Sequence, residues 1–138
     1  MRHVCDTKDG VKDLAQLQDV CTQRIESWLV FKQDLSRAYR NRAWAYWKQK
    51  KNGLARSDFT KAIETNSQDA EAYWLRGVFI SGSMTRKSTT ADIKLIAAKG
   101  IADFTRAIEA DPNHLNAYMS RGRTHSFLKD YDKAIADF

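Results

Sequence analysis

Three arginines and three aspartates recur in the same relative places of this 138-residue chain. They are Arg42, Arg76, Arg121, Asp58, Asp103 and Asp137. A guanidinium group beside a carboxylate makes two parallel, charge-assisted hydrogen bonds, so the recurrence predicts one ion pair in each of three similar units. Because a reaction centre is seldom repeated three times along one chain, we expect these pairs to stabilise the fold rather than to perform catalysis.

No other residue pattern indicates an enzyme. No nucleophile stands beside a base in a recognisable motif, and the chain has no glycine-rich phosphate loop. The three histidines, His3, His114 and His125, lack the spacing of metal ligands. We therefore expect no catalytic residue, no metal and no cofactor, and we expect His125 to belong to the core.

Cys5 and Cys21 are the only two cysteines. A pair of cysteines can form one disulfide, but two cysteines also suit the interior of a reduced protein as small apolar groups. Their spacing does not decide between these alternatives.

The elements that position these residues form an array of repeats. The run DFTKAIE at residues 58–64 returns as DFTRAIE at residues 103–109, an offset of 45. The Arg-Gly pair at 76–77 returns at the same offset, whereas Arg42 precedes Arg76 by 34 residues. These offsets predict a 34-residue unit with an 11-residue insertion in one copy, which is the period of paired-helix repeats.

Four segments follow from this period. Residues 1–35 form a degenerate leading half repeat, 36–69 a first repeat, 70–114 a second repeat with its insertion near 81–91, and 115–138 a truncated third repeat. Apolar and small residues three and four positions apart predict two helices in each full unit. A threonine before Ala91 predicts a lengthened helix from about Thr90 to Ala110, and Pro112 closes the second unit.

These positions resemble the tetratricopeptide repeat family over residues 36–138. The family pattern has an aromatic residue at the fourth position of each unit, here Tyr39, Tyr73 and Tyr118, and glycine at the eighth, here Gly77 and Gly122, with Ala43 in its place in the first repeat. The chain departs from the pattern at His125, where an aromatic residue is usual. The resemblance implies an all-α fold, a right-handed superhelix of antiparallel helix pairs.

A narrower resemblance concerns the leading segment. A cysteine near the start, then Cys21-Thr22 and an amphipathic helix are similar to a group of bacterial tetratricopeptide proteins that are often exported. That resemblance implies a periplasmic location after removal of a signal, and a disulfide between Cys5 and Cys21. The residues after Met1 lack the apolar stretch of a secretory signal, which by itself favours the cytoplasm. No apolar run is long enough for a transmembrane helix.

The family binds its ligands on the concave face, which the first helices of the repeats line. The resemblance therefore implies a binding surface made of Arg37, Arg40, Trp44, Trp47, Lys48, Trp74, Asn116, Arg123 and Phe127. Arginines mixed with large apolar side chains suit a protein or peptide partner that carries acidic and apolar residues. Packing between repeats is the alternative role of Trp44 and Trp74.

Some members of the family hold the terminal carboxylate of chaperone peptides at five positions, which here carry Arg40, Trp44, Leu75, Asn116 and Ser120. Most of the required lysine and asparagine side chains are absent, which disfavours a role as chaperone adaptor. Two other functions remain open. The chain has 23 basic and 17 acidic residues, and aromatic residues lie between the basic ones. A surface of this composition could bind nucleic acid. An uncapped C-terminal helix could instead make the chain an assembly piece that associates with itself or with a larger chain.

Overall fold

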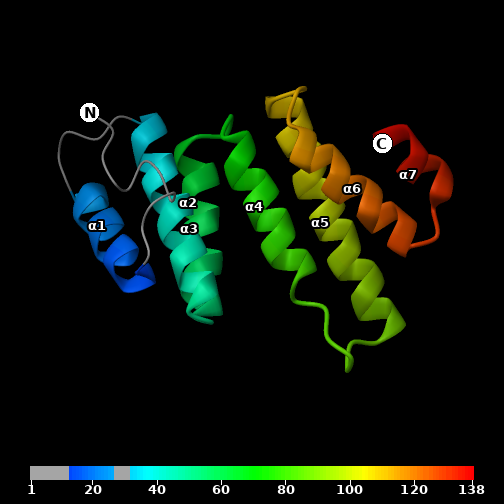
Figure 1. The fold of residues 1–138 in the computed structure, drawn as a ribbon, viewed down its shortest axis with the longest axis horizontal. Helices are drawn as coiled ribbons and strands as arrows, with labels where there is room; N and C mark the ends of the chain where they lie inside the picture. Colours follow the sequence, from blue (N-terminus) through cyan, green and yellow to red (C-terminus); the bar gives the residue numbers. More distant parts are fainter. Residues whose placement is uncertain (1–12, 27–31) are drawn as a thin grey trace. The chain divides into compact units, whose positions relative to one another are not determined.

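The computed structural model describes residues 13–26 and 32–138, which are almost entirely helical (Figure 1). Seven helices are present in these residues, and together they confirm the predicted all-α fold. They are α1 (Leu14–Glu26), α2 (Lys32–Lys48), α3 (Asn52–Thr65), α4 (Ala70–Ser81), α5 (Thr90–Ala110), α6 (Leu115–Phe127) and α7 (Tyr131–Asp137). No helix in the described part is long and apolar enough to cross a membrane.

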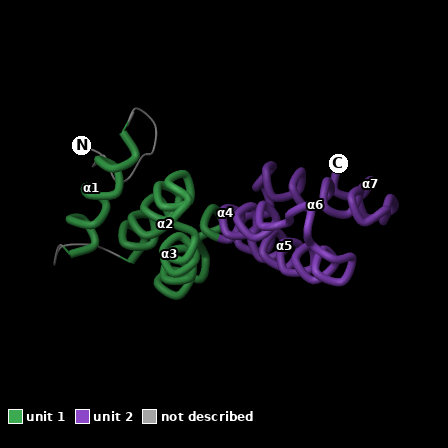
Figure 2. The backbone as a smooth tube through the Cα atoms, turned by 90° about the horizontal axis from the view of Figure 1, so that it is seen from below, with its two compact units in different colours: residues 1–72 green, residues 73–138 purple. Residues whose placement is uncertain are grey.

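The chain divides into two compact units, residues 1–72 and 73–138, coloured separately in Figure 2. The division falls inside α4, so the first unit contains α1, α2, α3 and the first residues of α4. The second unit contains the rest of α4 with α5, α6 and α7. Each unit is built from antiparallel helix pairs, α2 with α3 in the first and α6 with α7 in the second.

The core of the first unit depends on small residues at helix contacts. Leu17 and Cys21 of α1 pack against Ala38 and Ala45 of α2, and all four are buried. Among the described residues of this unit, Phe59 of α3 is the largest side chain that is fully buried. Because an alanine side chain adds little width, α2 can approach its neighbours closely enough to exclude water from the phenylalanine ring.

The second unit repeats one contact between a glycine and a ring. A Cβ atom placed on Gly77 would lie 2.6 Å from Cε1 of the buried Phe104. A Cβ atom on Gly122 would lie 2.8 Å from Cε1 of Phe138. In the second and third repeats, the glycine at the eighth position therefore leaves the space in which a phenylalanine ring from later in the same repeat lies.

The insertion lengthens α5 and adds a loop before it. The helix has 21 residues against 14 in α3, and its bounds, Thr90–Ala110, confirm the prediction. Thr89 caps its start, because the Thr89 hydroxyl accepts a hydrogen bond from the Asp92 amide at 3.1 Å, and the Asp92 carboxylate accepts one from the Thr89 amide at 3.0 Å. Asp111 and Pro112 follow the last turn, where the chain leaves the helix.

Candidate functional site

The structure brings together each predicted arginine and aspartate. Two nitrogens of each guanidinium donate to the two oxygens of one carboxylate in all three pairs. The distance from the Arg76 guanidinium to Asp103 Oδ1 is 2.8 Å, and that from the Arg121 guanidinium to Asp137 Oδ1 is 2.7 Å. Asp58 and Asp103 are buried, and Asp137 is half-buried with 6% of its side chain exposed, so each carboxylate depends on its arginine for compensation of its charge.

A threonine of the preceding helix completes two of these contacts. Arg42 donates a further hydrogen bond to the Thr22 hydroxyl, and Arg121 donates one to the Thr105 hydroxyl, both at 3.1 Å. The hydrogen bond to its aspartate raises the pKa of Arg42, and the same cause raises the pKa of Arg121. One arginine thus joins three successive helices, and it keeps its charge throughout the pH range in which proteins are folded.

The sequence analysis did not identify these threonines as partners. A signal was present, because the threonine occupies the third place of the recurring run DFTKAIE and DFTRAIE, and Thr22 aligns with it in the leading segment.

Two of the predicted binding residues on α2 are held by other groups. The Arg40 guanidinium donates to the Asp69 carboxylate at 3.2 Å, and the Ser36 hydroxyl donates to the same oxygen at 2.6 Å. Trp44 packs against the core between α1 and α2. Both side chains are thus engaged in contacts within the first unit.

The other predicted residues of α2 form a basic and aromatic cluster. The Lys48 ammonium lies 4.9 Å from the centre of the Trp47 ring and 5.6 Å from that of Trp44. Arg37 is partly exposed and lies 3.8 Å from Asp34. A ligand that met this face would contact mainly Lys48, Trp47 and Arg37.

In the second unit, the predicted residues gather on α6 and the neighbouring part of α4. The Trp74 indole N–H donates to the Ser120 hydroxyl at 3.0 Å, and its ring centre lies 5.7 Å from that of His114. Asn116, Arg123 and Phe127 are exposed on α6.

Large apolar side chains extend this surface. Leu115, Met119 and Phe127 expose 70%, 36% and 60% of their surface. They lie at intervals of four and eight residues, so they share one side of α6 with Arg123. The name α6 strip is used below for Leu115, Asn116, Met119, Arg123 and Phe127.

The predicted disulfide falls partly outside the described residues. Cys21 is completely buried between α1 and α2, whereas Cys5 lies among residues that the structure does not describe. The pairing of Cys5 with Cys21 stays a prediction.

A unit of about 34 residues that recurs as a pair of antiparallel helices defines a class of proteins, the helical-repeat scaffolds. Two family models, both described as tetratricopeptide repeat, match residues 40–80 and 104–136, which together make up more than half of the chain. The chain belongs to the tetratricopeptide repeat family. This is a family of protein–protein interaction domains that are generally not enzymes.

The curated relatives are plant proteins. Hsp70-Hsp90 organizing protein 3 of Arabidopsis thaliana is 26% identical over 131 residues, 94% of this chain and 21% of the relative. Hsp70-Hsp90 organizing protein 2 of the same plant is 28% identical over 95 residues, 67% of this chain and 14% of the relative. The chain thus spans about a fifth or less of their length, and these matches do not support the expected bacterial origin.

Several solved structures share the fold. YrrB, described as a tetratricopeptide protein with an unusual peptide-binding site, aligns with a TM-score of 0.63 at 17% identity over 90% of this chain and 56% of its own. MamA aligns with a TM-score of 0.64 at 19% identity over 98% and 78%. A monomeric IFIT1 mutant in complex with Gppp-AAAA aligns with a TM-score of 0.71 at 14% identity over 89% and 28%. At these identities the likeness concerns the fold alone.

Proposed function

We propose that this domain binds an extended segment of a partner protein on the first helices of its repeats, and that the segment is acidic and apolar. The observation that carries this proposal is the α6 strip, in which three exposed apolar side chains surround an exposed arginine. Contiguous apolar side chains on the surface of a soluble domain mark sites of interaction, because water covers them unfavourably.

The chemistry of the strip supports the kind of partner. Phe127 and Met119 offer area for a leucine or phenylalanine of the ligand, and Arg123 can form forked hydrogen bonds with a carboxylate. On α2, Lys48 and Arg37 add positive charge beside Trp47. The net charge of +6 favours the same acidic partner at long range.

The relatives are named for organising Hsp70 and Hsp90, which makes chaperones a class of partner to compare. Two of the five positions that would hold a terminal carboxylate are already used here. Leu75 is buried, and the Ser120 hydroxyl accepts the Trp74 indole N–H. We therefore propose that the ligand is recognised through internal acidic and apolar side chains rather than through its terminal carboxylate.

Selection from a library of random twelve-residue peptides, followed by fluorescence polarisation on the selected sequences, tests this proposal. We expect enrichment of peptides that combine Asp or Glu with Leu or Phe. Phe127→Ala and Arg123→Glu should each weaken binding by roughly tenfold, which is the usual effect of truncating an anchor residue.

Matched controls are available on α5. Leu95→Ala removes another exposed apolar side chain, and Arg106→Glu reverses another exposed arginine, which pairs with Glu109. Both controls should leave affinity unchanged. Equal losses in the controls and in the α6 variants, or no enrichment of any peptide, would contradict the proposal.

A second set of ligands separates the competing classes. C-terminal peptides of Hsp70 and Hsp90 are compared with a free and with an amidated terminus, and we expect amidation to have no effect. Single-stranded oligonucleotides are tested as well. If they bind with an affinity that decreases steeply with added salt, and no peptide binds, the result would favour a nucleic-acid ligand.

A further inference from the structure

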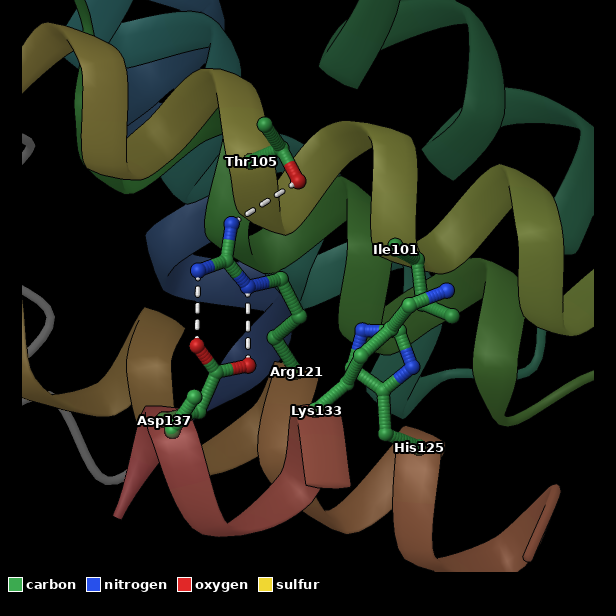
Figure 3. A pocket seen from close by; sticks show the side chains of 7 residues that line it. Ile101, Thr105, Arg121, His125, Lys133 and Asp137 are labelled. Atoms are coloured by element: carbon green, nitrogen blue, oxygen red, sulfur yellow. Dashed lines mark hydrogen bonds and ion pairs between the residues drawn. The ribbon is translucent and has the colours of Figure 1, made fainter. Parts of the chain in front are cut away.

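A cavity of about 270 Å³ lies between α5, α6 and α7 in the second unit (Figure 3). Its lining consists of Ile101, Thr105, Arg121, His125, Lys133, Ala136 and Asp137. The Arg121 guanidinium bonds there to Asp137 and Thr105, and the His125 imidazole lies nearby on the same helix (Figure 3). The name His125 cavity is used below for this space.

The repeat shows what occupies the corresponding place in the first unit. Arg42 corresponds to Arg121, and Tyr46 stands four residues after it as His125 stands four residues after Arg121. The Arg42 guanidinium carbon lies 5.7 Å from the centre of the Tyr39 ring and 5.6 Å from that of Tyr46. Two tyrosine rings, from successive turns of α2, therefore lie near the Arg42 guanidinium.

Arg121 has one tyrosine ring in place of two. The Arg121 guanidinium carbon lies 5.8 Å from the centre of the Tyr118 ring, which corresponds to Tyr39. The position of Tyr46 is taken by His125, whose side chain is smaller and has no phenol group. His125, at the position that Tyr46 takes in the first repeat and Ile80 in the second, lines the cavity.

The cations around the cavity do not favour a small anion. Arg121 is paired with Asp137, and the Lys133 ammonium lies 3.1 Å from Asp130. The His125 Nδ1 lies 4.0 Å from Asp130 as well. An inorganic anion would have to displace these carboxylates, whereas an aromatic ring can contact a guanidinium that keeps its carboxylate, as Tyr46 does at Arg42.

We infer that the His125 cavity is a second binding site, which takes the side chain of a tyrosine from a partner polypeptide. The ring lies against Arg121 as Tyr46 lies against Arg42, Ile101 and Ala136 offer apolar walls, and Lys133 lies where a phenol hydroxyl can find a polar partner. The site is separate from the α6 strip. Arg121 and His125 are two residues, about half a turn, from Arg123 and Phe127, so the two pairs lie on opposite sides of α6.

Nuclear magnetic resonance of the full chain tests the inference, with N-acetyltyrosinamide as probe and N-acetylleucinamide as its aliphatic control. We expect saturable shifts of the Ile101 methyl and His125 ring signals, half-maximal at roughly 1–10 mM as for a ligand of this size. The leucine control should bind at least about threefold more weakly, because it lacks the attraction of a ring to the guanidinium.

His125→Tyr supplies the missing ring from the chain itself and should remove the saturable shift of Ile101. Ala136→Met is a second blocking variant, which narrows the cavity from α7 and leaves His125 in place. Thermal unfolding of both variants shows whether they fold. Shifts in both folded variants that equal those of the native chain, or no saturable shift in the native chain, would overturn the inference.

A last comparison concerns the source of the ring. A tyrosine-containing hexapeptide is compared with 4-methylphenol and with the same peptide carrying leucine. Binding of the tyrosine peptide, and not of the leucine peptide, is expected. Binding of 4-methylphenol without the peptide would overturn the assignment to a polypeptide.

Discussion

Each arginine–aspartate pair concentrates two charges at a contact between two helices. The aspartate side chains are largely shielded from solvent, so removal of one arginine leaves a carboxylate without compensation in a region of low dielectric. The cost of breaking such a pair therefore exceeds the net stability that the intact pair provides. The pairs act first as a constraint on which helices fit together.

Charge reversal tests this role at Arg76 and Asp103. We expect Arg76→Asp to lower the free energy of unfolding by about 2–3 kcal/mol, because two carboxylates then face each other in a partly buried place. Combination with Asp103→Arg should restore part of this loss. Urea denaturation of both single variants and the double variant measures the coupling. Equal destabilisation by Arg76→Asp alone and by the double variant would show that the two residues do not pair.

Glycine at the eighth position gives a second test at the level of one residue. Gly77→Ala would place its Cβ 2.6 Å from the buried Phe104 ring, so we expect a loss of about 1–3 kcal/mol from overpacking. Gly53→Ala is the matched control. It lies near the start of α3 with no heavy atom within 4 Å of the added carbon, and it should stabilise by up to about 0.5 kcal/mol. Thermal unfolding compares the two, and a stabilising Gly77→Ala would contradict the packing argument.

At the level of an element, α5 depends on its cap. The hydrogen bond from the Thr89 backbone amide, together with that from the Thr89 hydroxyl, lowers the pKa of the Asp92 carboxyl. Since the pKa in the folded state lies below the unfolded value of about 3.9, the stabilisation is present above that value and is lost as the pH falls through the folded pKa. Amide exchange at residues 92–96 between pH 6 and pH 2 should therefore accelerate beyond its intrinsic pH dependence.

Two variants identify the cap as the cause. Thr89→Ala should increase the amide opening of the first turn at every pH, with a cost of about 1 kcal/mol. Asp92→Asn removes the titrating group and should abolish the additional pH dependence. Retention of that dependence in Asp92→Asn would assign it to another carboxyl group.

The spacing of residues along the sequence predicted the helices well. It did not predict which side chains of these helices bond to one another across long stretches of the chain. The bounds of α5 followed from a local threonine cap and a local stop at Pro112, although the capping residue is Thr89 and not the threonine next to Ala91. By contrast, the contact of Arg40 with Asp69 crosses 29 residues and depends on where the next helix begins. Such contacts are set by tertiary packing, which a periodic pattern alone does not specify.

The cavity illustrates a second limit of sequence reasoning. His125 departs from the family pattern, which indicates a change of side chain but does not show whether neighbours fill the space that it leaves. Whether the space stays open depends on how Ile101, Lys133 and Ala136 pack around it. The surroundings of a smaller side chain relax only in part, and the extent of that relaxation depends on all the neighbouring residues together.

At the scale of the whole molecule, α7 presents apolar side chains to solvent. Tyr131, Ile135 and Phe138 expose 60%, 72% and 68% of their surface at intervals of four and three residues. We expect the chain to associate with itself as its concentration rises, because pairing of these faces removes apolar area from water. Sedimentation velocity between about 5 and 500 μM measures this association.

Ile135→Lys should shift the association to roughly tenfold higher concentration, whereas Leu54→Lys on α3, an exposed leucine of the other unit, should leave it unchanged. A sedimentation coefficient that is constant over the whole range for the native chain would contradict the prediction.

The loop at residues 82–89 lies in sequence between two residues that bond to each other. Arg76 and Asp103 are 27 residues apart, whereas Arg42 and Asp58 are 16 apart, yet the same forked contact forms in both cases. The free energy of closing a loop grows only with the logarithm of its length, so the arginine–aspartate pair tolerates extra residues between α4 and α5. An engineer could therefore graft a foreign epitope or sensor sequence between α4 and α5 and display it from a fixed scaffold.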